Sequence, residues 1–136
     1  MKLPKVLLML GLLSVSGASL ADTAVLDLKK SAFPYTTGKD IFHNVCAACH
    51  MQDAKGATGA GFIPALASNP RLVNPNYMEF VIMNGQKGMP PFSQYLTNEQ
   101  MAETINYVRS HFGNTYTDKV KPEDLEKFRA TAVAAE

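Results

Sequence analysis

The sequence predicts an all-α fold of short helices joined by long loops. Apolar residues recur at helical spacing in several segments, and most of these segments are bounded by helix-cap residues or by glycine and proline. No segment alternates apolar and polar residues as a half-buried strand does. The chain has 136 residues, which fits one domain, and its formal net charge of +1 is too small to indicate nucleic acid or a membrane surface as a partner.

Residues 1–21 are expected to be a secretory signal peptide. Lys2 and Lys5 precede an apolar stretch, which gives way to small residues ending at Ala21. The alternative is a membrane anchor, but the uninterrupted apolar stretch is shorter than the ~20 residues that span a bilayer. We therefore expect cleavage after about Ala21, a periplasmic location, and a mature chain of about 115 residues without a membrane span.

The first expected helix runs from about Gly38 to Cys49, after a loose lead-in at residues 22–36. Thr37, with Asp40 three residues later, resembles the capping box that opens many helices. The loop that follows, from Met51 to Asn69, is rich in glycine and longer than compact domains usually tolerate without a function. The apolar residues of the helix share one face with both cysteines: Ile41, Phe42, Val45, Cys46 and Cys49.

A second helix is expected from Pro75 to Asn84, with Asn74 as its N-cap. The segment after it cannot be helical, because Pro90 follows Met89 and Pro91 follows Pro90. A residue that precedes proline is held in an extended conformation. Met89 is therefore presented from a stiff, non-helical segment.

A third helix opens at the capping box from Thr97 to Gln100, and Gly113 is expected to end it. Its apolar residues follow the i, i+4, i+7 pattern, so this helix has the strongest signal in the chain. Residues 114–136 form a C-terminal extension, in which Leu125 and Phe128 give a short amphipathic helix before the last residues fray.

Both cysteines and one histidine lie in the stretch Cys46-Ala47-Ala48-Cys49-His50. A structural disulfide would be awkward between cysteines three apart on one helix. A thiol-disulfide oxidoreductase needs its first cysteine at the start of a helix that follows a strand, which this sequence does not predict. A zinc site needs four ligands, and only His43 and His111 remain as partners.

Covalent haem attachment is the remaining interpretation, because Cys-X-X-Cys-His is its signature. Two sulfurs three residues apart on a helix can each form a thioether with one vinyl group of the porphyrin. The next residue, His50, then directs its imidazole at the iron. Export to the periplasm and the stiff segment at Met89 favour this interpretation over the thiol chemistry of the same residues.

From Thr37 to Phe112 the sequence resembles a class I c-type cytochrome. The resemblance implies a cytochrome c-like fold, with short helices and long loops wrapped around the haem. In this family the helix that ends in the haem motif crosses the last helix through a glycine and an aromatic residue, which Gly38 and Phe42 match. Tyr107 matches the aromatic partner on the last helix.

The resemblance also implies the iron ligands and one supporting contact. His50 is the proximal ligand, and Met89, in a loop before the last helix, matches the methionine that is usually the second ligand. Pro64 matches the proline whose carbonyl accepts the Nδ1 proton of the proximal histidine. The cofactor would be one haem c, held covalently through Cys46 and Cys49.

These expectations describe a periplasmic one-electron carrier with no catalytic residues of its own. Its domains are residues 1–21, 22–36, the cytochrome domain 37–113 and the extension 114–136. The segments around Met89 and Tyr107 are similar to small cytochrome subunits or acceptors of periplasmic dehydrogenases, so a dehydrogenase donor, an oxidase acceptor, or both are the expected partners. The alternatives are a thiol-disulfide oxidoreductase and a haem sensor or peroxidase in which Met89 is readily displaced.

Overall fold

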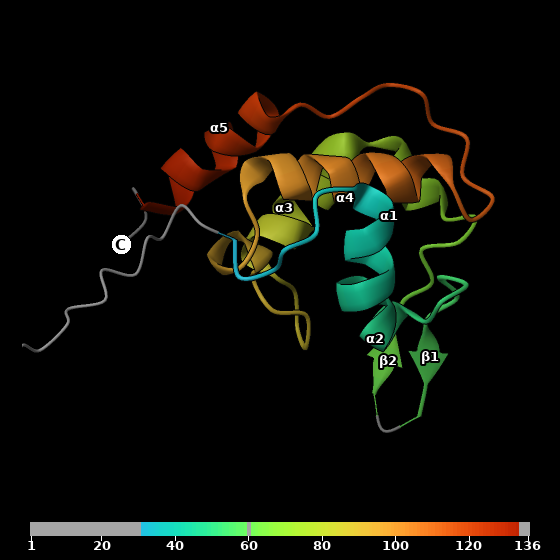
Figure 1. The fold of residues 1–136 in the computed structure, drawn as a ribbon. Coiled ribbons are helices and arrows are strands. Elements are labelled where there is room, and N and C mark those ends of the chain that lie inside the picture. Colours follow the sequence, from blue (N-terminus) through green and yellow to red (C-terminus); the bar gives the residue numbers. More distant parts are fainter. Residues whose placement is uncertain (1–30, 60, 134–136) are drawn as a thin grey trace, which may run out of the picture.

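The computed structural model describes residues 31–59 and 61–133, with side chains as far as Phe128 (Figure 1). The expected signal peptide lies outside these ranges. Within them the fold is mostly helical with long loops, as the sequence predicts. No helix in the described part of the chain has the length and apolar character needed to cross a membrane.

The first predicted helix is present but is built from three segments. These are α1 (Gly38–Ile41), a π-helical turn (Phe42–Cys46) and α2 (Ala47–His50). In the π-turn the Ala47 N–H donates to the carbonyl of Phe42, one residue farther back than in an α-helix. The spacing of the apolar residues does not distinguish these two turn types, so the sequence predicts a single α-helix.

The N-terminus of α1 differs from the expected capping box. Thr37 Oγ1 accepts from the backbone N–H of Asp40 at 3.1 Å, as an N-cap does. The Asp40 carboxylate accepts from the Thr37 hydroxyl at 2.7 Å, in place of the bond to the Thr37 backbone N–H that would complete the box. Aspartate is one methylene shorter than the glutamate of a full box, which fits this local pairing.

Helix α1 crosses α4 (Asn98–Ser110), and this crossing is the centre of the fold (Figure 1). A Cβ added to Gly38 would overlap the backbone carbonyl of Glu103, so the two helices approach too closely for any side chain there. Phe42 is fully buried, and its ring centroid lies 6.0 Å from that of Tyr107. The predicted contact between glycine, Phe42 and Tyr107 is thus confirmed.

Helices α3 (Pro75–Asn84) and α4 begin where the sequence predicts. Asn74 Oδ1 accepts from the N–H of Asn76 at the start of α3, and Thr97 and Gln100 form a complete capping box at the start of α4. Helix α4 ends at Ser110, earlier than expected, because the chain turns at Phe112 and Gly113. These two residues have φ angles of 59° and 82°.

The loops contain short elements that the sequence does not predict. Strand β1 (Ala57–Thr58) pairs antiparallel with β2 (Phe62–Ile63), and the pair projects beyond α2 (Figure 1). Two 3-10 turns lie at Pro70–Val73 and Phe92–Gln94. Strands of two residues are too short to show alternation, so the sequence does not predict this pair, and the fold remains mostly helical as expected.

The C-terminal extension covers the core. Helix α5 (Pro122–Val133) packs on α3 and α4, and it continues beyond the point where fraying was expected. Val120 and Leu125 are 4% and 0% exposed and belong to the same apolar cluster as Ile82 and Ile105. The extension is therefore an integral part of this fold.

Candidate functional site

The imidazole of His50 is held at the end of α2, immediately after the two cysteines. The residue is 9% exposed, and its Nδ1 lies 3.1 Å from the backbone carbonyl of Pro64. A carbonyl can only accept, so Nδ1 carries the proton and Nε2 keeps its lone pair. Burial lowers the pKa of His50, an effect that the Pro64 bond partly opposes. The ring is therefore neutral at neutral pH, as a metal ligand must be.

The loop between α2 and Pro64 is folded tightly onto the histidine. The Gly56 N–H donates to the carbonyl of His50 at 3.0 Å, and the Ala54 carbonyl accepts from Leu66 at 2.7 Å. Gly56 has a φ of 68°, and a Cβ there would overlap the carbonyl of Ile63 and crowd that of Pro64. The sequence does not mark Gly56, because a glycine-rich loop does not reveal which glycine the fold requires.

The two cysteine sulfurs lie in different environments on one helix and are not joined in a disulfide. Cys46 is half-buried between the cluster that contains Ile82 and Ile105 and a second apolar cluster that contains Phe42 and Val108, whereas Cys49 is exposed. Burial raises the pKa of the Cys46 thiol to about 12. A thiol oxidoreductase needs a thiol with a lowered pKa, so this environment weighs against that alternative.

Met89 lies in a tight non-helical turn, in agreement with the prediction from its prolines. Its N–H and carbonyl each bond to the backbone of Gln86 at 3.0 Å, and Lys87 turns the chain with a φ of 54°. The Met89 side chain is half-buried against the same apolar cluster that Cys46 touches. Thus a thioether is presented at the edge of the core from a different element than the thiols.

The remaining histidines are engaged elsewhere. His43 contacts Gln52 and Tyr107 through its two ring nitrogens. His111 follows the last turn of α4, and its Nδ1 lies 2.9 Å from the Tyr107 carbonyl, as expected for a group at a helix C-terminus.

The donors on the haem-motif helix and on the loop at Met89 match the chemistry of haem c. They comprise two thiols three residues apart, a neutral imidazole with a free Nε2, and a thioether on a separate loop. Together with the crossing of α1 and α4, this set defines a c-type cytochrome domain, a class whose function is electron transfer.

Comparison with known proteins gives the same class. Residues 34–108 match the family described as Cytochrome C oxidase, cbb3-type, subunit III, and the chain belongs to this family. It is 29% identical over 107 residues to the cytochrome c subunit of a quinone alcohol dehydrogenase from Gluconobacter oxydans (strain 621H). It is 37% identical over 94 residues to the cytochrome subunit of a fructose dehydrogenase from Gluconobacter japonicus.

A cytochrome c subunit of gluconate 2-dehydrogenase from Pantoea cypripedii is 26% identical over 108 residues. The three alignments cover 69%, 58% and 68% of this chain, in the order given. They cover 22%, 19% and 24% of the relatives, so the chain spans about a fifth of the length of the curated relatives it matches.

Proposed function

We propose that this chain is an exported one-electron carrier that holds a single haem c and receives electrons from a dehydrogenase. The observation that carries the proposal is the placement of His50. Its neutral ring follows directly after Cys46 and Cys49, and the bond from Nδ1 to Pro64 leaves Nε2 for iron. Haem c, when bound, supplies an iron centre that gains and loses one electron.

Each proposed site residue has one role. Cys46 and Cys49 attach the porphyrin through thioethers, and His50 is the proximal ligand. Pro64 fixes the ring of His50 and makes it more basic, which favours ferric iron. Met89 supplies a soft, uncharged sulfur that favours ferrous iron, and its ligation leaves no open position for a substrate.

The location and domain boundaries of the mature protein are part of the proposal. Residues 1–21 direct export to the periplasm, residues 37–113 form the cytochrome domain, and residues 114–136 form the extension. N-terminal sequencing of the protein isolated from the periplasmic fraction should begin at or near Asp22. Retention of Met1 in the cytoplasmic fraction would contradict export.

The first experiment tests covalent attachment. The full-length gene is expressed in a bacterium with haem-attachment machinery, and the protein is extracted with acid and acetone. We expect the haem to stay with the wild-type protein, and a Cys46→Ala/Cys49→Ala variant to release all of it. Loss of colour from the wild type, together with freely reactive thiols, would instead support a thiol-disulfide oxidoreductase.

The second experiment tests the role of Met89. Met89→Leu keeps the volume but removes the sulfur, and Met78→Leu is a matched control because Met78 is also half-buried against the same cluster. We expect carbon monoxide to bind reduced Met89→Leu but not the wild type or Met78→Leu. Binding to the wild type at neutral pH would favour the alternative of a sensor or peroxidase with a displaceable methionine.

The third experiment tests the partner. The dehydrogenase relatives support a donor of that kind, whose substrate the alignments do not specify. A stable subunit should copurify with a larger dehydrogenase from the native cell. A diffusible shuttle to an oxidase should purify alone and still be reduced by a membrane fraction supplied with the dehydrogenase substrate.

A further inference from the structure

His43 lies on the helix that carries the haem motif, yet both of its ring nitrogens are used by residues outside that helix. Nδ1 is 2.6 Å from Gln52 Oε1, and Nε2 is 3.1 Å from the hydroxyl of Tyr107. In the neutral ring Nδ1 donates to the amide oxygen, and Nε2 accepts from the phenol. One half-buried imidazole thus joins three separate segments of the chain.

Gln52 contacts residue 43 a second time. Its Nε2 donates to the backbone carbonyl of His43 at 3.3 Å, so the amide holds both the ring and the main chain of that residue. Gln52 lies two residues after His50, where the chain leaves α2 through Met51. Met51 has a φ of 66°, a backbone conformation that residues other than glycine rarely adopt. A turn of this kind persists when contacts from outside it hold the backbone.

Tyr107, on α4, holds the Nε2 side of the His43 ring. Its ring centroid lies 6.0 Å from that of Phe42 at the crossing of α1 and α4, and 4.1 Å from that of His111. The hydroxyl that reaches His43 is therefore held in place by the crossing of α1 and α4. The chain of contacts runs from α4 through His43 to the turn that follows His50.

We propose that His43 is a positioning residue for His50. It ties the turn after His50 to α4, and this turn begins the loop that brings the Pro64 carbonyl to Nδ1 of the ligand. The inference rests on the proposed function, in which His50 is the proximal ligand. If the tie is removed, the bond to Pro64 loosens, the imidazole becomes less basic, and the iron shifts toward the ferrous state.

The test uses the haem-loaded, full-length protein. His43→Leu, Gln52→Leu and the double variant are compared with the wild type by potentiometric titration and by electron paramagnetic resonance of the ferric form. We expect each single variant to raise the ferrous-to-ferric ratio at a fixed potential at least threefold, which is about 28 mV at 59 mV per tenfold. The double variant should shift no further than the larger single shift, because both residues act through one contact.

Asn44→Ala is the matched control. Asn44 is adjacent to His43, and its side chain donates to the Asp40 carbonyl on the same helix without reaching the loop. We expect this variant to leave the potential and the ferric spectrum unchanged. Tyr107→Phe removes only the hydroxyl and should shift the potential in the same direction as His43→Leu.

Unchanged potentials and ferric spectra in His43→Leu and Gln52→Leu, with only a lower Tm, would overturn the proposal and leave His43 as a packing residue. If His43→Leu does not retain haem, Gln52→Leu and Tyr107→Phe decide the question on the same criterion. Failure of the proposed function would differ from this result, because the wild-type ferric spectrum would then lack the signature of a histidine ligand.

Discussion

At the scale of single residues, the site depends on Gly56, whose side chain is a single hydrogen atom. Gly56 contributes twice, because its N–H donates to the His50 carbonyl and its missing Cβ leaves room for the carbonyls of Ile63 and Pro64. The bond between Pro64 and His50 therefore rests on a close approach of two backbones. A side chain at Gly56 would therefore disturb the contact between the His50 imidazole and the Pro64 carbonyl.

Gly56→Ala should displace the Pro64 carbonyl from His50. The φ of 68° and the overlap with the facing backbone both oppose a side chain, and overpacking of this kind costs about 1–3 kcal/mol. We expect the haem-loaded variant to have a lower Tm and a higher midpoint potential, measured by thermal unfolding and potentiometry. Gly59→Ala is the control, since no atom lies within 4 Å of a Cβ added there. Equal behaviour of the two variants would contradict this account.

At the scale of elements, the caps of α3 and α4 could be predicted because they are local. Asn74 and Thr97 act on N–H groups two or three residues away, so the sequence alone contains the interaction. The π-helical turn at Phe42–Cys46 could not be predicted in this way. Whether a turn takes one extra residue depends on what both of its faces pack against, and those partners come from distant segments.

The candidate site likewise has a local part that the sequence predicts and a part that depends on distant segments. The motif from Cys46 to His50 is contiguous, and its chemistry is readable from residue types and spacing. The link from His43 to Tyr107 spans 64 positions, and nothing in the sequence near His43 indicates it. Sequence reasoning therefore does not predict the contacts that His43 makes.

The C-terminal extension is fastened to α4 by one buried guanidinium. Arg109 is 1% exposed, and its nitrogens donate to the carbonyls of Leu72 at 2.9 Å, Val73 at 3.2 Å and Asp118 at its shortest contact of 2.6 Å. It also pairs with the Asp118 carboxylate and lies over the Tyr116 ring at 5.4 Å. One side chain on α4 thus contacts both the distant segment at Leu72 and Val73 and the start of the extension at Asp118.

Arg109→Met should destabilise the protein strongly, because it leaves the three carbonyls without this donor, and an unsatisfied buried group costs about 1–3 kcal/mol. The matched variant Asp118→Asn keeps the backbone contact and alters only a carboxylate whose side chain is 63% exposed. We expect Arg109→Met to lower the Tm by several degrees more than Asp118→Asn does, measured by circular dichroism. Comparable losses would show that the ion pair, rather than the carbonyl contacts, holds the extension.

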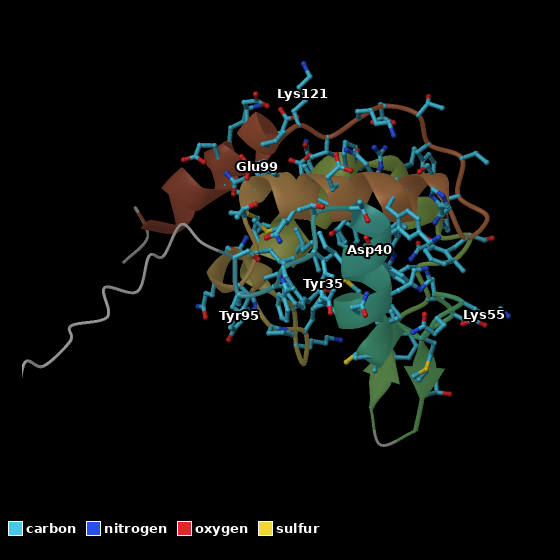
Figure 2. All side chains as sticks on the ribbon, in the orientation of Figure 1. Tyr35, Asp40, Lys55, Tyr95, Glu99 and Lys121 are labelled. Atoms are coloured by element: carbon cyan, nitrogen blue, oxygen red, sulfur yellow. The ribbon has the colours of Figure 1, made fainter. Side chains whose placement is uncertain are left out.

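At the scale of the whole molecule, the extension is what buries the one acidic side chain found in the core of the described chain. Glu79, on α3, is 3% exposed and lies in the field of Asp124 and Lys127 on α5. The other acidic side chains that the structure describes are exposed or half-buried, among them Asp40 on α1 and Glu99 on α4, which Figure 2 labels. Covering the core with α5 therefore places a carboxyl group where its charge is unfavourable.

Burial raises the pKa of Glu79, Asp124 adds to the rise, and Lys127 and Arg109 oppose it. A raised pKa means that the folded protein binds more protons than the unfolded chain between the two pKa values. The stability linked to Glu79 is thus fully present below the ordinary pKa of glutamate and is lost as pH rises through the folded value. Asp118 and Asp124 have lowered pKa values, so their contributions are lost only at more acidic pH.

Glu79→Gln should therefore raise the Tm at neutral pH and reduce the fall of the Tm as pH rises above the ordinary pKa of glutamate, since the amide carries no charge to bury. The measurement is thermal unfolding of the haem-loaded protein across that range, and Glu103→Gln is the control because Glu103 lies exposed on α4. We expect the control to keep the wild-type slope. An unchanged slope in Glu79→Gln would mean that this carboxylate is solvated in solution, and hence that α5 does not stay closed over α3.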